Sequence, residues 1–334
     1  MLNRFFLKLL EKQNAPFLYV DCGARNEFNN LLVEMLPTAK YIGFEPDRQE
    51  CDRLVRLAKQ GYSYYPVALG KSAEKRSLYI TSNSACSSLL QPNNEFWDQF
   101  LYCAEQIKIE AIQEIQTVPL DSFLPGIKIH HIDFLELDTQ GTELEILQGA
   151  ESFLSSTVLG IKVEVKFSYM YQNQPLFSDI DPYLRQFDFM LFDLSRHRYR
   201  RVNYPNECET RGQLLYGQAF YLKDYHVIKA DKKDAFYKLI FIADFYGFHD
   251  YALEVVNFLL SGDAGRLDHF ESDMLEQIRN IYTCESVPDK KTKVLRLLHN
   301  SPLRKILHKL MSVCKTIVYR YYQLTEKNRY SWSD

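Results

Sequence analysis

Short apolar runs alternate with helical patterns along the first two thirds of this 334-residue chain. Each run is bounded by polar residues, as a buried strand should be, and the stretches between them repeat apolar residues every three or four positions. The predicted strands are 17–20, 41–44, 64–69, 132–138, 158–167, 189–194 and 214–222, and the predicted helices between them include 28–36, 51–59 and 180–187. This alternation predicts an α/β fold with a parallel sheet and right-handed crossovers, in which the last two strands form an antiparallel pair.

The segment between residues 77 and 132 is less regular. Residues 77–90 predict an extended piece followed by a polar loop, and residues 95–112 have a helical pattern. Residues 115–124 predict a second extended piece that ends in a turn.

Both ends of the chain are predicted to be helical. Residues 1–16 form an amphipathic helix through Leu2, Phe5, Phe6, Leu9 and Leu10, for which packing on its own domain is favoured over membrane contact. Residues 17–225 are the α/β domain. Residues 226–334 are a helical region, with a helical pattern over 232–260 that breaks at 246–250.

The last part of the chain is basic. Residues 301–334 hold seven Lys or Arg against two acids, five net positive charges, on an amphipathic pattern. Such a helix can contact an anionic membrane or a partner protein, although an ordinary docking helix with a solvated face is the favoured interpretation.

Charge and cysteine usage narrow the class of protein. A net charge of −3 and a pI near 6.3 argue against nucleic-acid binding by the whole surface. The seven cysteines are dispersed without a C-x-x-C pair, which predicts reduced thiols in the cytoplasm. No apolar run approaches the roughly 18 residues of a membrane-spanning helix, so we expect a cytoplasmic protein, peripheral to the membrane if its basic end binds lipid.

Three predicted strands end in polar residues that point to a ligand site. The first strand is followed by Asp21 and Gly23, and a glycine there permits close approach of the backbone to a ligand. Glu45 follows the second strand, where an acid can accept hydrogen bonds from ribose hydroxyls. Asp138 and Gln140 follow the fourth strand. Because carboxyl ends of parallel strands meet at one edge of a sheet, these residues predict a cofactor pocket.

The residues after the first strand favour one cofactor. Gly23 is followed by Ala-Arg-Asn-Glu-Phe, so the G-x-G-x-x-G fingerprint of dinucleotide folds is missing. Asp21 would repel a diphosphate, whereas it suits a ligand that carries an amino group and a cationic centre. This chemistry favours S-adenosylmethionine over NAD.

The motifs FLYVDCGARNEF, YIGFEPD, YYPVALGKS, VPLDSFL, IDFLELDTQGTELEILQGAE and VEVKFSYMYQNQPLFSDIDPYL resemble the FkbM family of S-adenosylmethionine-dependent methyltransferases. The resemblance covers about residues 17–223. It implies the class I methyltransferase fold, a Rossmann-like seven-stranded sheet, here with a helical C-terminal extension. The implied reaction is O-methylation of a hydroxyl on a sugar, glycan or related natural product.

The resemblance also implies roles for individual residues. Asp21 and Gly23 would flank the methionine part of the cofactor, and Glu45 would hold its ribose. Ala68 and Leu69 would line the adenine, and Asp138 with Gln140 would lie near the transferred methyl group. The chain departs from the family in two places: Arg25 stands where Asn is usual, with no second glycine after it, and Glu136 stands where Lys is common.

Methyl transfer to a hydroxyl benefits from a general base. The main candidates are Asp138, for which a helix cap is the alternative role, and Glu164 in the fifth strand, for which an ordinary paired carboxylate is the alternative. His130 and His131 would point to opposite faces of a strand, so they predict no metal pair. We expect no required metal and leave open a Mg²⁺ held by carboxylates.

The arginine-rich run 196–201 could bind the phosphate of a nucleotide- or lipid-linked sugar, but a solvated hairpin is favoured. A catalytically inactive methyltransferase-like protein, which binds or scaffolds partners through its C-terminal helices, is the main alternative function. A nicotinamide-dependent oxidoreductase on the same sheet is disfavoured by the missing glycines.

Overall fold

The structure is a computed structural model that describes residues 3–25, 30–205, 209–263 and 265–283. The chain divides into two compact units, Met1–Tyr282 and Thr283–Asp334. The second unit lies outside the described residues apart from Thr283, and so does the predicted basic helix at 301–334. Among the described residues, no helix has the length and apolarity that crossing a membrane requires.

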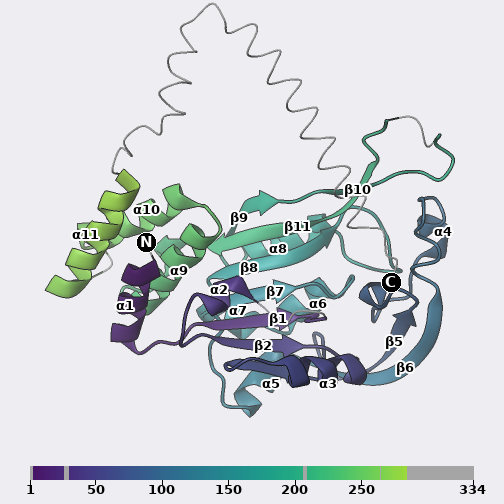
Figure 1. The fold of residues 1–334 in the computed structure, drawn as a ribbon, viewed down its shortest axis with the longest axis horizontal. Helices are drawn as coiled ribbons and strands as arrows, with labels where there is room; N and C mark the ends of the chain where they lie inside the picture. Colours follow the sequence, from purple (N-terminus) through teal and green to yellow (C-terminus); the bar gives the residue numbers. More distant parts are fainter. Residues whose placement is uncertain (1–2, 26–29, 206–208, 264, 284–334) are drawn as a thin grey trace, which may run out of the picture. The chain divides into compact units, whose positions relative to one another are not determined.

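An eight-stranded sheet forms the centre of the first unit, in the order β10-β11-β8-β7-β1-β2-β3, with β9 also paired to β11 (Figure 1). Its strands are β1 (Leu18–Cys22), β2 (Lys40–Phe44), β3 (Tyr62–Tyr65), β7 (Phe134–Leu137), β8 (Gly160–Lys166), β9 (Phe189–Leu194), β10 (His197–Tyr199) and β11 (Gln213–Lys223). The first five run parallel, and β11 runs antiparallel to its three neighbours. The predicted strands other than 64–69 are confirmed, as is the antiparallel pairing of the last two, and β10 is an addition.

This α/β sheet is parallel over five adjacent strands and has helices on both faces, as the sequence predicted. The helices of the first unit are α1 (Asn3–Gln13), α2 (Leu31–Glu34), α3 (Arg48–Leu57), α4 (Asn94–Trp97), α5 (Leu120–Gly126), α6 (Glu143–Gln148), α7 (Glu151–Ser156), α8 (Phe177–Arg185), α9 (Lys233–Phe245), α10 (His249–Ser261) and α11 (His269–Thr283). Helices α5 to α8 bury their apolar residues with one face of the sheet, in a cluster that includes Val20, Leu135 and Val163.

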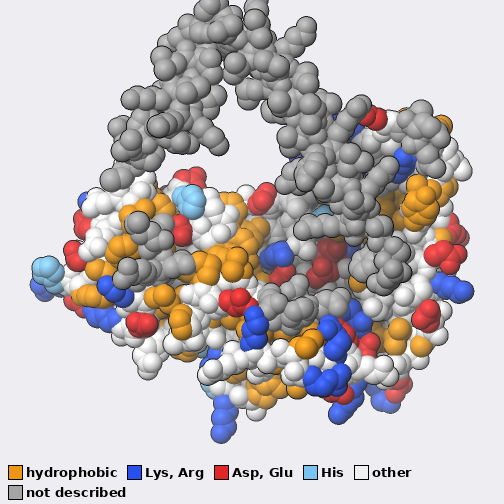
Figure 2. Space-filling view, in the orientation of Figure 1, with side chains coloured by type: hydrophobic (Ala, Val, Ile, Leu, Met, Phe, Trp, Pro, Cys, Tyr) orange, Lys and Arg blue, Asp and Glu red, His pale blue; other side chains and the backbone are white. Residues whose placement is uncertain are grey.

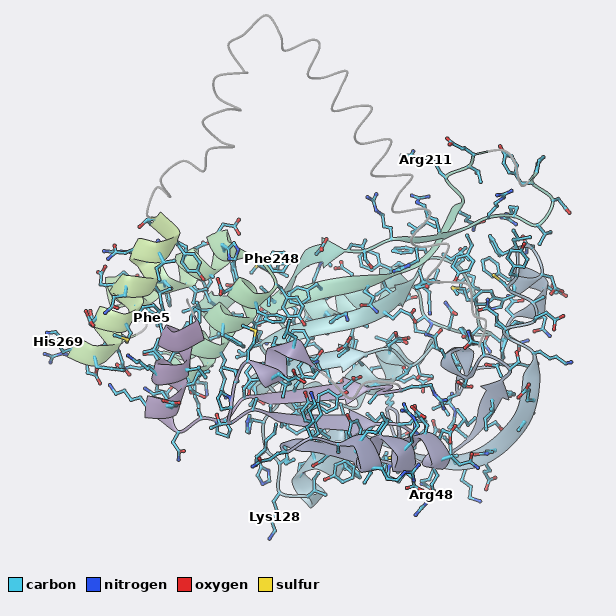
Figure 3. The ribbon with its side chains drawn as sticks, viewed as in Figure 1. Phe5, Arg48, Lys128, Arg211, Phe248 and His269 are labelled. Atoms are coloured by element: carbon cyan, nitrogen blue, oxygen red, sulfur yellow. The ribbon has the colours of Figure 1, made fainter. Side chains whose placement is uncertain are left out.

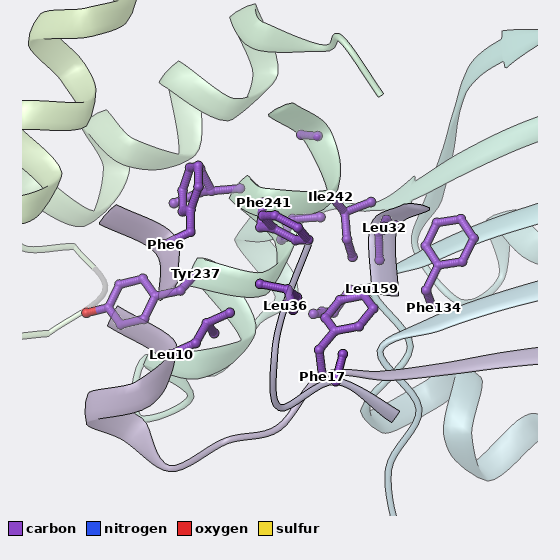
Figure 4. Packing of buried hydrophobic residues seen from close by; sticks show 14 of the residues in the cluster. Phe6, Leu10, Phe17, Leu32, Leu36, Phe134, Leu159, Tyr237, Phe241 and Ile242 are labelled. Atoms are coloured by element: carbon purple, nitrogen blue, oxygen red, sulfur yellow. The ribbon is translucent and has the colours of Figure 1, made fainter. Parts of the chain in front are cut away.

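The other face of the sheet is covered by the two ends of the described chain. Phe6 of α1 and Phe241 of α9 are buried together, with their rings edge to face and 5.9 Å between centroids (Figure 4). The same cluster takes in Phe134 of β7 and residues of α2, α3, α10 and α11. The predicted N-terminal helix therefore packs on its own domain, and the helical hairpin predicted within 232–260 is confirmed as α9 and α10.

A buried ion pair joins α9 to the sheet. The Lys238 ammonium lies 3.0 Å from Oδ1 of Asp133, just before β7, and both side chains are almost fully buried. Oδ2 of Asp133 accepts a 2.7 Å hydrogen bond from the backbone N–H of Leu18. Asp133 thus connects the starts of two central strands with a helix that lies about a hundred residues further along the chain.

Three predictions between residues 62 and 132 need correction. The predicted strand 64–69 is two strands, because Pro66 has no N–H for the ladder and β4 (Ala68–Leu69) pairs instead with β6 (Ile109–Val118). The predicted helix 95–112 is wrong beyond α4: turns follow, and its last residues enter β6, which pairs along β5 (Lys75–Thr81). The predicted turn near residue 120 is helix α5.

Candidate functional site

The predicted site residues of β1, β2, β7 and β8 come together at the carboxyl ends of these parallel strands. Asp21 is buried within β1, and its Oδ2 accepts a 2.5 Å hydrogen bond from the hydroxyl of Tyr41 on β2. The carboxylate therefore lies on the sheet face that also holds the stacked rings of Tyr19 and Tyr41.

Gly23 forms the tight turn after β1. Its φ of +97° is a left-handed conformation that favours glycine, and a Cβ there would lie 2.1 Å from the carbonyl oxygen of Asp138. The N–H groups of Gly23 and Ala24 both donate to the carbonyl of Phe44, at 3.0 Å. Gly23 therefore lets the turn after β1 pack closely against the backbone that follows β7. This packing brings the ends of β1, β2 and β7 together.

Glu45 at the end of β2 is buried and has partners for both carboxylate oxygens. Oε1 accepts the backbone N–H of Asp47 at 2.8 Å, and Oε2 lies 3.3 Å from Nε of Arg25. Arg25 also donates to Oδ2 of Asp47 at 2.8 Å. Burial raises the pKa of Glu45, and the Arg25 guanidinium partly opposes that rise. The sequence showed Arg25 only as a departure from the family pattern. Its ion pair with Glu45 could not be predicted, because the fold brings these two residues together from about twenty residues apart.

Ala68 and Leu69 form the short strand β4, and both are buried. They pair with Thr117 and Val118 of β6, and Leu69 belongs to the apolar cluster under α5 to α8. They follow β3 along the chain, and β3 is the sheet neighbour of β2, the strand that Glu45 follows.

Gln140 is the centre of the polar network beyond β7. It has a left-handed φ of +59°, and its Nε2 donates to Asp138 at 2.7 Å and to Glu164 at 3.0 Å. Its Oε1 accepts from Nζ of Lys166 and from the hydroxyl of Tyr171, both at 3.2 Å. One amide therefore holds both predicted catalytic carboxylates in place.

Glu143, a residue that sequence reasoning did not select, closes the loop before α6. Its buried carboxylate accepts the N–H of Thr139 at 2.9 Å and the N–H of Gly141 at 3.0 Å. The alternative role of Asp138 as a helix cap is wrong, since Glu143 takes the backbone donors of this turn. Asp138 is left half-buried beside Gln140.

Glu164 forms an ion pair with Lys166, its neighbour on the same face of β8. The two side chains are only 4% and 1% exposed. Burial raises the pKa of Glu164, Asp138 raises it further, and the Lys166 ammonium partly opposes the rise. Lys166 also lies over the ring of Tyr216, 5.0 Å from its centroid. The strand alternation could have revealed Lys166, because residues two apart share a face.

Asp138, Glu143 and Glu164 each place a carboxylate oxygen within 4.8 Å of the others. Such a group could hold a cation, but Lys166 already pairs with Glu164, and Glu143 accepts backbone donors. The predicted lack of a required metal remains a prediction. His131 contacts the carbonyl of Pro16 before the β7 strand, remote from these carboxylates in the fold.

The polar loop within 77–90 and the arginine-rich run 196–201 have structural roles. Ser88 donates to the carbonyl of Gln140 at 2.8 Å, so the serine-rich loop supports the network. Burial raises the pKa of Cys86 to about 11, which disfavours a reactive thiolate. In the arginine run, Arg201 donates to the side chains of Gln99 and Gln213 and lies over the ring of Phe100.

A family model decides where this fold and site belong: the methyltransferase FkbM domain matches residues 21–191, about half of the chain. The chain belongs to the FkbM methyltransferase family. As a member it is an S-adenosylmethionine-dependent methyltransferase, and the resemblance found in its motifs is confirmed. No curated protein sequence matches this FkbM methyltransferase.

Solved structures resemble it only distantly. Magnesium protoporphyrin IX methyltransferase from Synechocystis, solved with bound S-adenosylmethionine, is 11% identical over 67% of this chain and 78% of its own, with a TM-score of 0.32. A precorrin-6y C5,15-methyltransferase from Geobacter metallireducens is 11% identical over 66% of this chain and 87% of its own, with a TM-score of 0.32. Similarities of this size assign no substrate.

Proposed function

We propose that this FkbM methyltransferase methylates a hydroxyl oxygen of a sugar, glycan or related natural product. The observation that carries the proposal is the buried carboxylate of Glu164, which is held at the carboxyl edge of the sheet. Lys166 and Gln140 both bind its Oε2. Among the described residues, none donates a hydrogen bond to Oε1, so this oxygen is free to take a proton from an acceptor.

The strand-end residues fit the cofactor. Glu45 has a buried carboxylate where a ribose would lie, and Asp21 and Asp138 supply negative charge for an amino group and a sulfonium. We assign Asp21, Gly23, Glu45, Ala68, Leu69, Asp138 and Gln140 to cofactor binding. A ribose must compete with Arg25 for Oε2 of Glu45. When bound, S-adenosylmethionine supplies an electrophilic methyl group.

The chain contributes a base and its orientation. An acceptor hydroxyl gives its proton to Oε1 of Glu164, or to Asp138, as its oxygen becomes the nucleophile. Burial raises the pKa of Glu164, which makes its carboxylate a stronger base toward the acceptor proton. Gln140 keeps the two carboxylates from turning away, since its amide binds both.

The test offers glycan acceptors together with S-adenosylmethionine that carries a deuterated methyl group. We expect a product with one added labelled methyl ether, located on oxygen by mass spectrometry. Label on nitrogen or carbon would contradict the O-methyl proposal. If the folded protein neither binds S-adenosylmethionine nor labels any acceptor, the result supports the alternative of a binding or scaffolding protein. The Arg25–Glu45 ion pair, which occupies the carboxylate expected to bind the ribose, would then explain the lost cofactor binding.

Cytoplasmic localisation remains a prediction. So does contact of residues 301–334 with a membrane surface or a protein, because this segment lies outside the described residues.

A further inference from the structure

A hollow lies beside the candidate site, between α4 and the segment that follows β8. It measures about 410 Å³, which is within the usual range for small-molecule sites. Glu95 and Phe96 of α4 line one side, and Ser168 and Tyr169 line the other. Figure 1 shows α4 near the end of the fold where β5 and β6 lie, away from α9 to α11.

The hollow and the candidate site share a wall. The backbone N–H of Asn93 donates to the carbonyl of Met170 at 3.0 Å, and Pro92 pairs with Tyr171. The Tyr171 hydroxyl in turn donates to Gln140 in the catalytic network. Tyr169 is two residues from Tyr171, so their backbones are at most about 7 Å apart. The segment that lines the hollow therefore continues directly into the polar network around Gln140.

Several groups in the hollow are available to a ligand. The Tyr169 side chain is 59% exposed, and neither its hydroxyl nor the Glu95 carboxylate has a partner among the described residues. Ser168 accepts from Gln213 at 3.3 Å and keeps its own proton to donate. Asn93 positions this rim, since its Nδ2 donates to the carbonyl of Tyr169 at 3.0 Å.

These groups suit a sugar. A pyranose has an apolar C–H face, which packs on an exposed aromatic ring, and a rim of hydroxyls, which donate to a carboxylate and accept from a serine. The residues that line the hollow in the described chain include no Lys or Arg, and Glu95 would repel a phosphate. Figure 2 shows charged side chains of both signs scattered over the displayed face.

We propose that this hollow is the acceptor subsite and binds an uncharged sugar ring, which stacks on Tyr169 and donates a hydroxyl hydrogen bond to Glu95. The assignment rests on the proposed O-methyl transfer to a glycan and names the part of the chain that selects the acceptor.

The test is saturation-transfer NMR on the full-length protein. The probes are the methyl glycosides of glucose, galactose, mannose and N-acetylglucosamine, each at millimolar concentration. We expect at least one to bind, with saturation strongest on one ring face. Tyr169→Ala and Glu95→Gln should each weaken it about 3- to 10-fold. Tyr169→Phe, which keeps the ring, should weaken it less than Tyr169→Ala.

The matched control is Tyr102→Ala, which removes a tyrosine that is 77% exposed and does not line the hollow. Equal binding by wild type, Tyr169→Ala and Tyr102→Ala would overturn the subsite, and so would no binding of any glycoside. A parallel titration with S-adenosylmethionine separates the two proposals. If the cofactor binds while the glycosides do not, the subsite fails and methyl transfer stands; if the cofactor does not bind, the proposed function fails.

Discussion

Lys166 and Glu164 form a buried ion pair on one face of β8, and Gln140 binds both side chains. Two residues of one strand are thereby tied to the loop that ends the neighbouring strand, β7. Removing one partner of such a pair leaves a buried charge without compensation, so substitutions here should be read by both activity and stability.

Glu164→Gln should lower kcat about 100-fold or more, because the amide cannot accept the acceptor proton. Binding of S-adenosylmethionine should be unchanged, because Glu164 is not assigned to the cofactor. Methylation kinetics and calorimetry measure the two effects. Glu114→Gln, on the exposed strand β6, is the control and should keep full activity. Full activity of Glu164→Gln would remove this residue from the mechanism.

Lys166→Met should shift the pH dependence of kcat/KM toward higher pH. The Lys166 ammonium lowers the pKa of Glu164, which burial and Asp138 raise. Without it the pKa rises further, so the carboxylate is protonated, and activity is lost, at a higher pH than in the wild type. Lys166→Arg keeps a cation and should shift the profile less. An unchanged acidic limb in Lys166→Met would show that Glu164 does not set it.

Glu45→Ala should weaken S-adenosylmethionine binding about 5- to 150-fold, because the ribose hydroxyls lose a charged acceptor. Calorimetric titration measures this directly and does not depend on turnover. Glu34→Ala removes an exposed acid that pairs with Lys59 and should have no effect. Equal affinities for wild type and Glu45→Ala would place the ribose elsewhere.

Gly23→Ala should cost about 2–6 kcal/mol of unfolding free energy, the sum of roughly 1–3 for left-handed strain and 1–3 for overpacking. The added Cβ would lie 2.1 Å from the carbonyl oxygen of Asp138. Gly126→Ala in α5 meets nothing within 4 Å and should be neutral or stabilising by up to about 1 kcal/mol. Urea unfolding compares the two, and similar values for both would contradict the close approach.

Lys238→Met should destabilise the protein by about 3–5 kcal/mol at neutral pH, because Asp133 is left charged and buried. Burial already raises the pKa of Asp133. Because the pKa of Asp133 is raised in the folded state, its contribution to stability is greatest below the unfolded-state pKa. That contribution is lost as the pH rises through the folded-state pKa. The destabilisation of the variant should therefore shrink in acid. Lys232→Met, at an exposed position, should change stability by less than about 0.5 kcal/mol.

Figure 3 shows the side chains of this helical region together with those of the sheet.

Helical periodicity misled the sequence analysis in one region. Residues 95–112 match an amphipathic helix, yet residues from Ile109 onward form β6. Their hydrogen bonds go to β5, about thirty residues earlier, and such long-range pairing overrides local propensity. Pro66 shows the opposite case, since its missing N–H breaks a strand by a purely local effect that the sequence displays.

The sequence by itself determined the sheet and its polar edge. Apolar runs must be buried, parallel strands need crossovers, and acids at strand ends therefore meet, which was enough to place Asp21, Glu45 and Asp138 at one edge. Only the tertiary structure decided their partners. Arg25 reaches Glu45, and Gln140 joins Glu164, because side chains far apart in sequence were brought within hydrogen-bond distance by strand order and packing. Propensity and periodicity act over a few residues, whereas these contacts depend on the position of every strand between them.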